Sequence, residues 1–184
     1  MRYNVAQLLR GPVGEKREYA LDEEIGFLDQ EIDPVRRLAG SVSLIRTSQG
    51  ILVTGRLRTA LRVVCRRCLE PSQAEVELDL EEEFYPTVPM DGAALDRVLE
   101  EELDEAALID EYHILDLGEV IRQELLMAVP MGALCRPDCA GLCSRCGGNR
   151  NLGECQCEES LPDPRWAELA ALLAPELEST ERSD

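Results

Sequence analysis

Apolar and polar residues alternate over two stretches in the first half of the chain, which predicts two paired β-strands. The first stretch covers residues 51–63 and the second covers residues 75–81. The segment C-R-R-C-L-E-P at 65–71 lies between them and is typical of a hairpin tip. A preceding hairpin is predicted by the apolar alternation of residues 40–46 and by the polar turn T-S-Q-G at 47–50.

The first forty residues carry weaker signals. Tyr3–Val5 and Glu18–Leu21 each have enough alternation for a short strand, and a turn is expected through Gly11–Gly14. Asp33-Pro34 marks a boundary before the stronger pattern begins.

The alternation also predicts which side chains share a face of the second hairpin. Arg56, Arg58 and Arg62 lie on one face of its first arm, away from the apolar side chains. The expected register pairs three residues of each arm: Leu61 with Val76, Arg62 with Glu75, and Arg58 with Asp79. In that register the arginines neutralise the neighbouring strand; the alternative is that they form an RNA-binding stripe.

Helical periodicity appears in the second half of the chain. Residues 116–129 carry a broad apolar face, with Asp116 as the expected N-cap, Glu119 completing a capping box, and Pro130 ending the helix. We expect this helix to cover the inner face of the sheet. A shorter amphipathic helix is predicted from Asp163 to Pro175. The only histidine, His113, has no neighbours that would complete a catalytic triad.

Eight cysteines provide the strongest chemical signal. Two of them form the C-x-x-C of the hairpin tip, and six lie within residues 135–157. Four thiolates in a tetrahedron are a common way to bind zinc, so eight predict two Zn²⁺ ions. Spacing groups them into two sets, which are Cys65, Cys68, Cys135 and Cys139 in one site, and Cys143, Cys146, Cys155 and Cys157 in the other.

Other uses of these cysteines stay open at the level of sequence. The partition could instead group Cys135, Cys139, Cys143 and Cys146. An iron–sulfur cluster is the main alternative to zinc, and a disulfide scaffold or a redox dithiol at Cys65 and Cys68 are further ones. With four thiolates on each zinc, no coordination position would remain for catalysis, so we expect no enzymatic activity.

Charge is concentrated in one stretch. The 184 residues carry a net charge of −18, and residues 75–111 hold 15 acidic residues and one basic residue. Such a chain is repelled by phosphate backbones and favours basic partners. The alternative is that the acidic run is a solvated linker. The candidate partner-binding acids are Glu81, Glu82, Glu83, Glu100, Glu101, Glu102, Asp104 and Glu105.

These patterns predict an α+β fold, in which an antiparallel β-sheet is packed by a helix and a zinc-knuckle or zinc-ribbon module lies near the C-terminus. The expected divisions are a β-rich core over 1–134 with an acidic excursion at 86–111, a cysteine-rich module at 135–160, and a helix with a tail at 161–184. The N-terminus holds no apolar run of about 7–15 residues, so we expect a cytoplasmic protein whose thiols are reduced.

Three segments together resemble the YceD family, the large-subunit ribosomal RNA accumulation proteins. They are V-C-R-R-C-L-E-P (64–71), the cysteine-rich run at 134–157, and D-P-R-W-A-E-L (163–169); the opening N-V-A-Q-L-L-R also fits. The resemblance implies a role in the accumulation of 23S ribosomal RNA and in biogenesis of the large subunit. Some family members keep the C-x-x-C and the positions of Cys135 and Cys139, one as His, but lack the later four cysteines.

The resemblance and the charge lead to an expected function. We expect a ribosome biogenesis factor that binds a basic large-subunit ribosomal protein or a pre-ribosomal particle, with neither a membrane nor a small-molecule substrate as partner. The alternative is direct binding of ribosomal RNA by arginines near the zinc knuckles, Arg66, Arg67, Arg145 and Arg150, to which Arg136 and the hairpin arginines would add. A processing nuclease finds no support in the residues.

Overall fold

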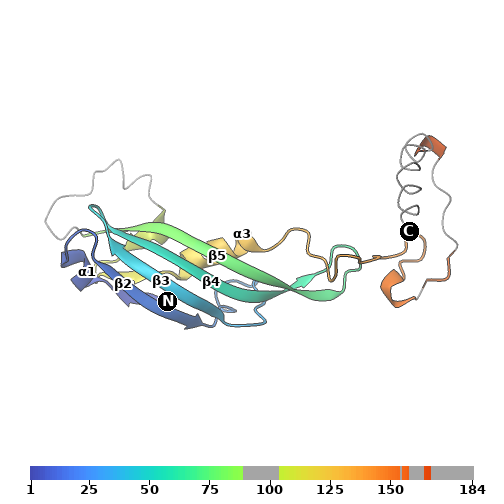
Figure 1. Ribbon diagram of the computed structural model, residues 1–184, viewed down its shortest axis with the longest axis horizontal. Coiled ribbons are helices and arrows are strands. Elements are labelled where there is room, and N and C mark those ends of the chain that lie inside the picture. Colours follow the sequence, from blue (N-terminus) through green and yellow to red (C-terminus); the bar gives the residue numbers. More distant parts are fainter. Residues whose placement is uncertain (89–103, 154, 158–163, 167–184) are drawn as a thin grey trace, which may run out of the picture. The chain divides into compact units, whose positions relative to one another are not determined.

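The computed structural model describes residues 1–88, 104–153, 155–157 and 164–166 (Figure 1). The chain divides into two compact units, Met1–Gly141 and Leu142–Asp184. The division lies after Cys139, whereas the sequence suggested a boundary before Cys135. The difference arises because Cys135 and Cys139 lie beside the hairpin cysteines Cys65 and Cys68 and therefore belong to the first unit.

Unit Met1–Gly141 is built on one seven-stranded sheet with the order β1-β7-β6-β5-β4-β3-β2. Three long neighbouring strands dominate it, and neighbours are antiparallel except for β5 and β6. The strands are β1 (Arg2–Asn4), β2 (Lys16–Glu23), β3 (Leu38–Arg46), β4 (Ile51–Val64), β5 (Pro71–Pro86), β6 (Leu108–Ile109) and β7 (Ile114–Asp116).

The β4–β5 hairpin has the predicted faces but a different register. Leu61 lies opposite Ala74 rather than Val76, and Arg58 lies opposite Glu77 rather than Asp79. The tip explains the shift: Val64 already pairs with Pro71, so only six residues turn the chain. Because the shift is two residues and side chains alternate with period two, every side chain keeps its predicted face.

Cross-strand ion pairs line the outer face of this hairpin. Arg56 pairs with Asp79 at 2.9 Å and Arg58 with Glu77 at 3.1 Å. Arg62 lies opposite Gln73 and instead pairs with Asp33 at 2.9 Å, a residue of the loop between β2 and β3. The prediction that these arginines neutralise the neighbouring strand is therefore confirmed for Arg56 and Arg58 and is wrong for Arg62, which pairs with a loop residue.

Short elements complete the sheet and curl it. Helix α1 (Ala6–Arg10) follows β1 directly, where the sequence suggested only the end of a strand and a turn. Strand β6, which pairs in parallel with β5 at Tyr85–Leu108 and Pro86–Ile109, lies inside the segment 86–111 that was expected to be an acidic excursion. The sheet is curled so that its two outermost strands come close together. The rings of Tyr3 in β1 and Tyr19 in β2 lie 4.8 Å apart.

Helix α3 (Gly118–Ala128) packs its apolar face into the core, as expected. It contributes Val120, Ile121 and Leu125, which are buried with the inward-facing residues of the sheet. The predicted N-cap is wrong: the cap is Leu117, and Asp116 instead ends β7, where it pairs with Arg2. Asp116 Oδ1 still accepts from the N–H of Gly118 at 2.9 Å, so Asp116 satisfies one free backbone donor of the first helical turn.

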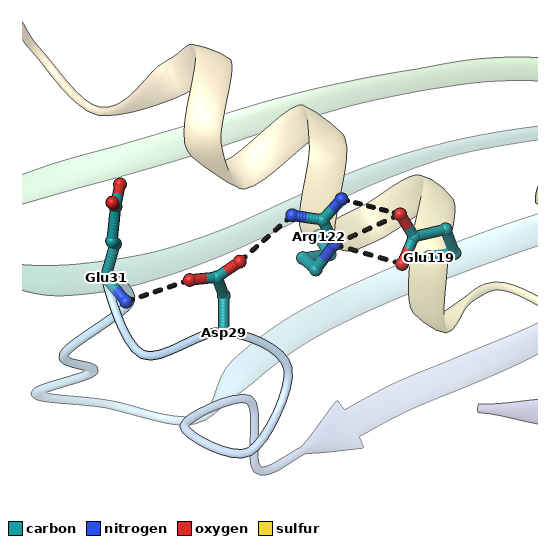
Figure 2. Close-up of polar contacts among 4 residues, drawn as sticks. All are labelled: Asp29, Glu31, Glu119 and Arg122. Carbon is teal, nitrogen blue, oxygen red and sulfur yellow. Dashed lines mark hydrogen bonds and ion pairs between the residues drawn. The ribbon is translucent and has the colours of Figure 1, made fainter.

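An arginine on α3 connects the helix to the loop between β2 and β3 (Figure 2). The guanidinium of Arg122 donates to Asp29 Oδ2 at 2.9 Å and to both carboxylate oxygens of Glu119. The other oxygen of Asp29 accepts from the backbone N–H of Glu31 at 2.9 Å. About three quarters of the Arg122 and Asp29 side chains is shielded from solvent, with relative exposures of 27% and 24%.

Unit Leu142–Asp184 consists of turns in its described part. Leu142 and Asn149 form an isolated β-bridge, and two 3-10 turns follow, η2 (Arg150–Leu152) and η3 (Pro164–Trp166). The helix predicted from Asp163 to Pro175 falls almost entirely outside the described residues. Within the described part of the chain, no helix is long and apolar enough to cross a membrane.

Candidate metal centres

The first candidate metal centre consists of Cys65 and Cys68 at the β4–β5 tip together with Cys135 and Cys139, which follow α3. The sulfur atoms of Cys65 and Cys139 lie 3.8 Å apart, and those of Cys68 and Cys135 lie 3.7 Å apart. Cys65, Cys68 and Cys139 are buried, with exposures of 0%, 3% and 2%. They form a small core of their own with Leu134 packed against it.

Backbone hydrogen bonds shape the hairpin tip into a knuckle. The N–H of Cys65 donates to the carbonyl of Glu70 at 2.9 Å, and the N–H of Leu69 donates to the carbonyl of Cys65 at 2.8 Å. Two further bonds connect the tip to the later cysteine segment: Arg66 N–H to the carbonyl of Ala133 at 3.0 Å, and Arg67 Nη1 to the carbonyl of Cys139 at 3.0 Å. The tip and the segment after α3 are therefore joined by one backbone–backbone bond and one bond from an arginine side chain.

The second candidate metal centre consists of Cys143, Cys146, Cys155 and Cys157. It repeats the knuckle: the N–H of Cys143 donates to the carbonyl of Gly148, and the N–H of Gly147 donates to that of Cys143, both at 2.9 Å. The sulfur atoms of Cys146 and Cys155 lie 3.6 Å apart. The structure thus groups the eight cysteines as their spacing suggested, rather than joining Cys135 and Cys139 to Cys143 and Cys146.

The sulfur geometry fits a tetrahedral metal ion. Four thiolates at about 2.3 Å from a zinc ion lie about 3.8 Å from one another. The measured separations are 3.6–3.8 Å, and all four sulfur atoms of each centre lie within 4.8 Å of one another. A disulfide would need sulfur atoms at about 2.05 Å, and all eight cysteines are free thiols. Both clusters could therefore hold a metal ion.

Each centre contains one acidic thiol. The backbone N–H of Cys68 stabilises the Cys65 thiolate and lowers its pKa to about 6, and the backbone N–H groups of Cys146 and Arg145 do the same for Cys143. Desolvation and the neighbouring thiols raise the pKa of Cys135 to about 12. The thiols of Cys146 and Cys155 raise that of Cys157 to about 12. Without a cation the sulfur atoms oppose one another's ionisation; a divalent cation would replace their protons.

One position distinguishes the two knuckles. The residue after the second cysteine has a left-handed backbone in both, with φ of 61° at Leu69 and 73° at Gly147. Glycine adopts this conformation without steric cost, whereas a leucine is strained by roughly 1–2 kcal/mol. The Leu69 side chain is 61% exposed, so little packing compensates for the strain.

We therefore expect Leu69→Gly to keep the first centre's metal and to raise the free energy of unfolding by roughly 0.5–1 kcal/mol, after the entropy cost of glycine. The matched change Gly147→Ala should destabilise the second knuckle by a similar amount, since it introduces the strain there. Chemical denaturation and metal analysis of both variants test this. An unstable L69G protein would show that the leucine makes contacts which outweigh its backbone strain.

The arginines predicted to bind RNA differ from one another in their contacts. Arg67 donates to the carbonyl of Cys139, and Arg136 pairs with Asp138 at 3.6 Å. Arg66 has no ion pair among the residues that the structure describes, and its guanidinium extends over Gly132. Arg145 contributes its backbone N–H to the sulfur of Cys143 at 3.4 Å. Arg150 begins the η2 turn beside the second centre.

The acidic residues of this region fall into two groups, those with an ion pair to an arginine and those without one in the described residues. The outward acids of the tip half of β5, Glu75, Glu77 and Asp79, pair with Arg36, Arg58 and Arg56. Further along, Glu83 accepts from Thr47 and Tyr85. Glu81, Glu82, Asp104 and Glu105 have no ion pair within the described residues. Glu100, Glu101 and Glu102 lie outside that part of the chain.

The topology adds an acid that sequence reasoning missed. Desolvation raises the pKa of Glu82, and the negative charges of Asp104 and of Glu124 on α3 raise it further. Glu124 lies on the polar side of its helix in the sequence pattern, and only the packing of α3 against β5 brings it near Glu82. This end of β5 therefore carries carboxylates that repel one another.

Comparison with known proteins identifies the family to which the chain is similar. The model of the family described as "Large ribosomal RNA subunit accumulation protein YceD" matches residues 53–173. An uncharacterized protein of Mycobacterium tuberculosis (strain ATCC 25618 / H37Rv) is 36% identical over 130 residues, which is 70% of this chain and 58% of that protein. The Zea mays protein named large ribosomal RNA subunit accumulation protein YCED homolog 1, chloroplastic, is 27% identical over 140 residues, 64% of this chain and 47% of that protein.

No solved structure matches the chain. The chain spans less than two thirds of the length of these relatives, 58% of the Mycobacterium tuberculosis protein and 47% of the Zea mays one. The family match covers both hairpin cysteines and all six later ones, and it extends over more than half of the sequence. The chain belongs to the YceD family of large ribosomal RNA subunit accumulation proteins.

Proposed function

We propose that this chain is a cytoplasmic, non-enzymatic ribosome biogenesis factor that binds a basic large-subunit ribosomal protein, alone or within a pre-ribosomal particle. The distribution of uncompensated acids carries the proposal. Acids on the tip half of β5 are neutralised by arginines, whereas Glu81, Glu82, Asp104 and Glu105 have no ion pair within the residues that the structure describes. We refer to these four residues as the acidic end. The family name supports a role in the accumulation of large-subunit ribosomal RNA.

A cationic partner would relieve the repulsion at the acidic end. The raised pKa of Glu82 reflects a carboxylate that is desolvated and close to the negative charges of Asp104 and Glu124. Lysine or arginine side chains placed there would stabilise the ionised form and would gain attraction from several carboxylates at once. Basic extensions of ribosomal proteins have this chemistry.

The two cysteine clusters serve this function as scaffolds, and we propose that each binds one Zn²⁺ ion. Four thiolates in a closed tetrahedron favour zinc over the harder divalent cations. When bound, such an ion crosslinks ligand segments and contributes no reactive site. The first centre would hold the β4–β5 hairpin, and with it the acidic strand, in a defined position.

The test is affinity capture with matched charge variants. The quadruple variant E81Q/E82Q/D104N/E105Q removes four charges from the acidic end. The control E18Q/E75Q/E77Q/D79N removes four charges whose carboxylates are already paired with Lys16, Arg36, Arg58 and Arg56. We expect the wild type and the control to capture a basic large-subunit ribosomal protein at low salt, and the acidic-end variant to lose at least about tenfold.

Mass spectrometry identifies the captured proteins, and binding to the purified ribosomal protein follows. Equal loss in both variants, or capture of no ribosomal protein by the wild type at low salt, would contradict the proposal. Direct RNA binding through Arg66 and Arg145 is the alternative. It would be indicated if nuclease treatment abolishes capture and R66E/R145E, but not the acidic-end variant, weakens it.

A further inference from the structure

We infer that the two metal centres differ in kind: the first is a permanent structural centre, and the second is a peroxide-sensitive centre that releases its metal when its thiolates are oxidised. The inference rests on the proposed binding of one metal ion by each cluster. It concerns Cys143, Cys146, Cys155 and Cys157.

Access to the sulfur atoms is the first difference. In the first centre three of four cysteines are buried, with exposures of 3% or less. Its fourth cysteine, Cys135, is exposed. In the second centre none of the four is buried, and both Cys146 and Cys157 are exposed. An oxidant must contact a sulfur atom to oxidise it, so the rate of cysteine oxidation rises with exposure and with thiolate character. Metal binding keeps all four sulfurs as thiolates, which leaves exposure to decide between the centres.

The surrounding scaffold is the second difference. The first centre's knuckle continues two strands that pair over fourteen residue positions. The Arg66 N–H donates to the carbonyl of Ala133, and the Arg67 side chain donates to the carbonyl of Cys139, so the two ligand segments are held together. The second knuckle lies in a segment of turns, where its own turn bonds, the bridge between Leu142 and Asn149, and hydrogen bonds from Asn151 to the Asn149 side chain connect residues close in the chain, and no strand of the sheet continues from it in the described residues. Its sulfur atoms can therefore rearrange without opening a sheet, whereas those of the first centre cannot.

The oxidation step balances with hydrogen peroxide as the oxidant. Two metal-bound thiolates lose two electrons and form one S–S bond. The O–O bond of hydrogen peroxide breaks as it gains these two electrons, and with two protons from solvent it becomes two water molecules. Cys146 and Cys155 suit this step, because their sulfur atoms lie 3.6 Å apart and need to approach to about 2.05 Å. Two thiolates remain, which bind a divalent cation far more weakly than four, so the ion leaves.

The experiment follows metal release in the full chain. Elemental analysis first gives the metal content of the reduced protein, and a chromogenic metal indicator then records release during titration with hydrogen peroxide. We expect one of two ions to leave at least about tenfold faster than the other. Mass spectrometry should locate the first disulfide among residues 143–157. The circular dichroism of the sheet should be unchanged at that point, and thiol reductant with added metal should restore the second ion.

Variants assign the released ion to its centre. C146S/C157S should bind one ion and release none at the peroxide concentration that empties the wild type's second centre. Release of both ions at the same rate, or a first disulfide among the cysteines at 65, 68, 135 and 139, would overturn the inference while leaving metal binding intact. A reduced protein without any metal would instead contradict the proposed metal binding itself, so the two failures are distinguishable.

Discussion

Replacing Cys65 with alanine is expected to remove one metal ion per chain and to lower the thermal midpoint of unit Met1–Gly141 by roughly 10–20 °C. Cys65 is fully buried, and it shares the first centre with Cys139, which is 74 positions later in the sequence. A metal ion bound there closes a long loop and binds only the folded chain, so its binding free energy adds to folding. Losing a structural metal is among the largest effects that single substitutions produce.

Cys146→Ala is the matched control for this prediction. It also removes one ligand from a four-cysteine cluster, but in the second centre, which belongs to unit Leu142–Asp184. We expect one ion to be lost while the main unfolding transition keeps its midpoint. Calorimetry with metal analysis distinguishes the cases. If C65A retains both ions, or if both variants unfold at the wild-type temperature, the first centre is not a structural metal site.

Arg122→Ala is expected to lower the thermal midpoint by a few degrees at neutral pH. The substitution removes three hydrogen bonds to Glu119 and one to Asp29, and it leaves the partly shielded Asp29 carboxylate without its cation (Figure 2). The loop between β2 and β3 would lose its ion pair to α3 and keep its apolar packing in the core. Arg56→Ala is the control, because Arg56 and Asp79 are 69% and 78% exposed and exposed pairs contribute little.

The Arg122 effect should depend on pH in a defined direction. A hydrogen bond from the Glu31 N–H and one from Arg122 lower the pKa of Asp29, and Arg122 lowers that of Glu119. A lowered folded-state pKa contributes stability that is present above the unfolded value, about 4, and is lost as pH falls through the folded value. The midpoints of wild type and R122A should therefore converge below about pH 4.

Comparing the two proteins at each pH is necessary because the whole chain is acidic. With a net charge of −18, protonation of other carboxylates also relieves repulsion, and that effect is common to both proteins. The difference between them isolates the Arg122 pairs. A difference that stays constant down to about pH 2 would show that Arg122 acts through packing rather than through its charge.

Sequence reasoning recovered the features that depend on local periodicity. The two hairpins, their inward and outward faces and the apolar face of α3 all depend on residues that are close in the chain. The second cysteine group is also local, and the first followed from it because four cysteines remained. The knuckle at 65–70 also lies where its two cysteines and Pro71 predicted a turn. Period two survives a shift of register by two, so the faces were right although the partners of Arg58 and Leu61 were not.

The remaining features depend on contacts between distant segments. The register at the tip is determined by the knuckle hydrogen bonds between Cys65 and Glu70, which alternation does not encode. Asp116 resembles a helix cap, but pairing with Arg2 places it at the end of a strand. Likewise, Asp33 and Arg36 come to the hairpin only because the loop after β2 crosses it, so their ion pairs with Arg62 and Glu75 have no local signal.

The first centre can be completed only after its last ligand has been synthesised. On a ribosome that adds about 5–20 residues per second, Cys139 is made roughly 4–15 s after Cys65. The β4–β5 hairpin can form early because its contacts are local, and during that interval its tip holds two thiols without their later partners. The emergence of Cys135 and Cys139 then closes the centre at about the time that β7 becomes available to β1. Nascent chains halted before Cys135 would accordingly carry a half-formed site that is open to thiol reagents.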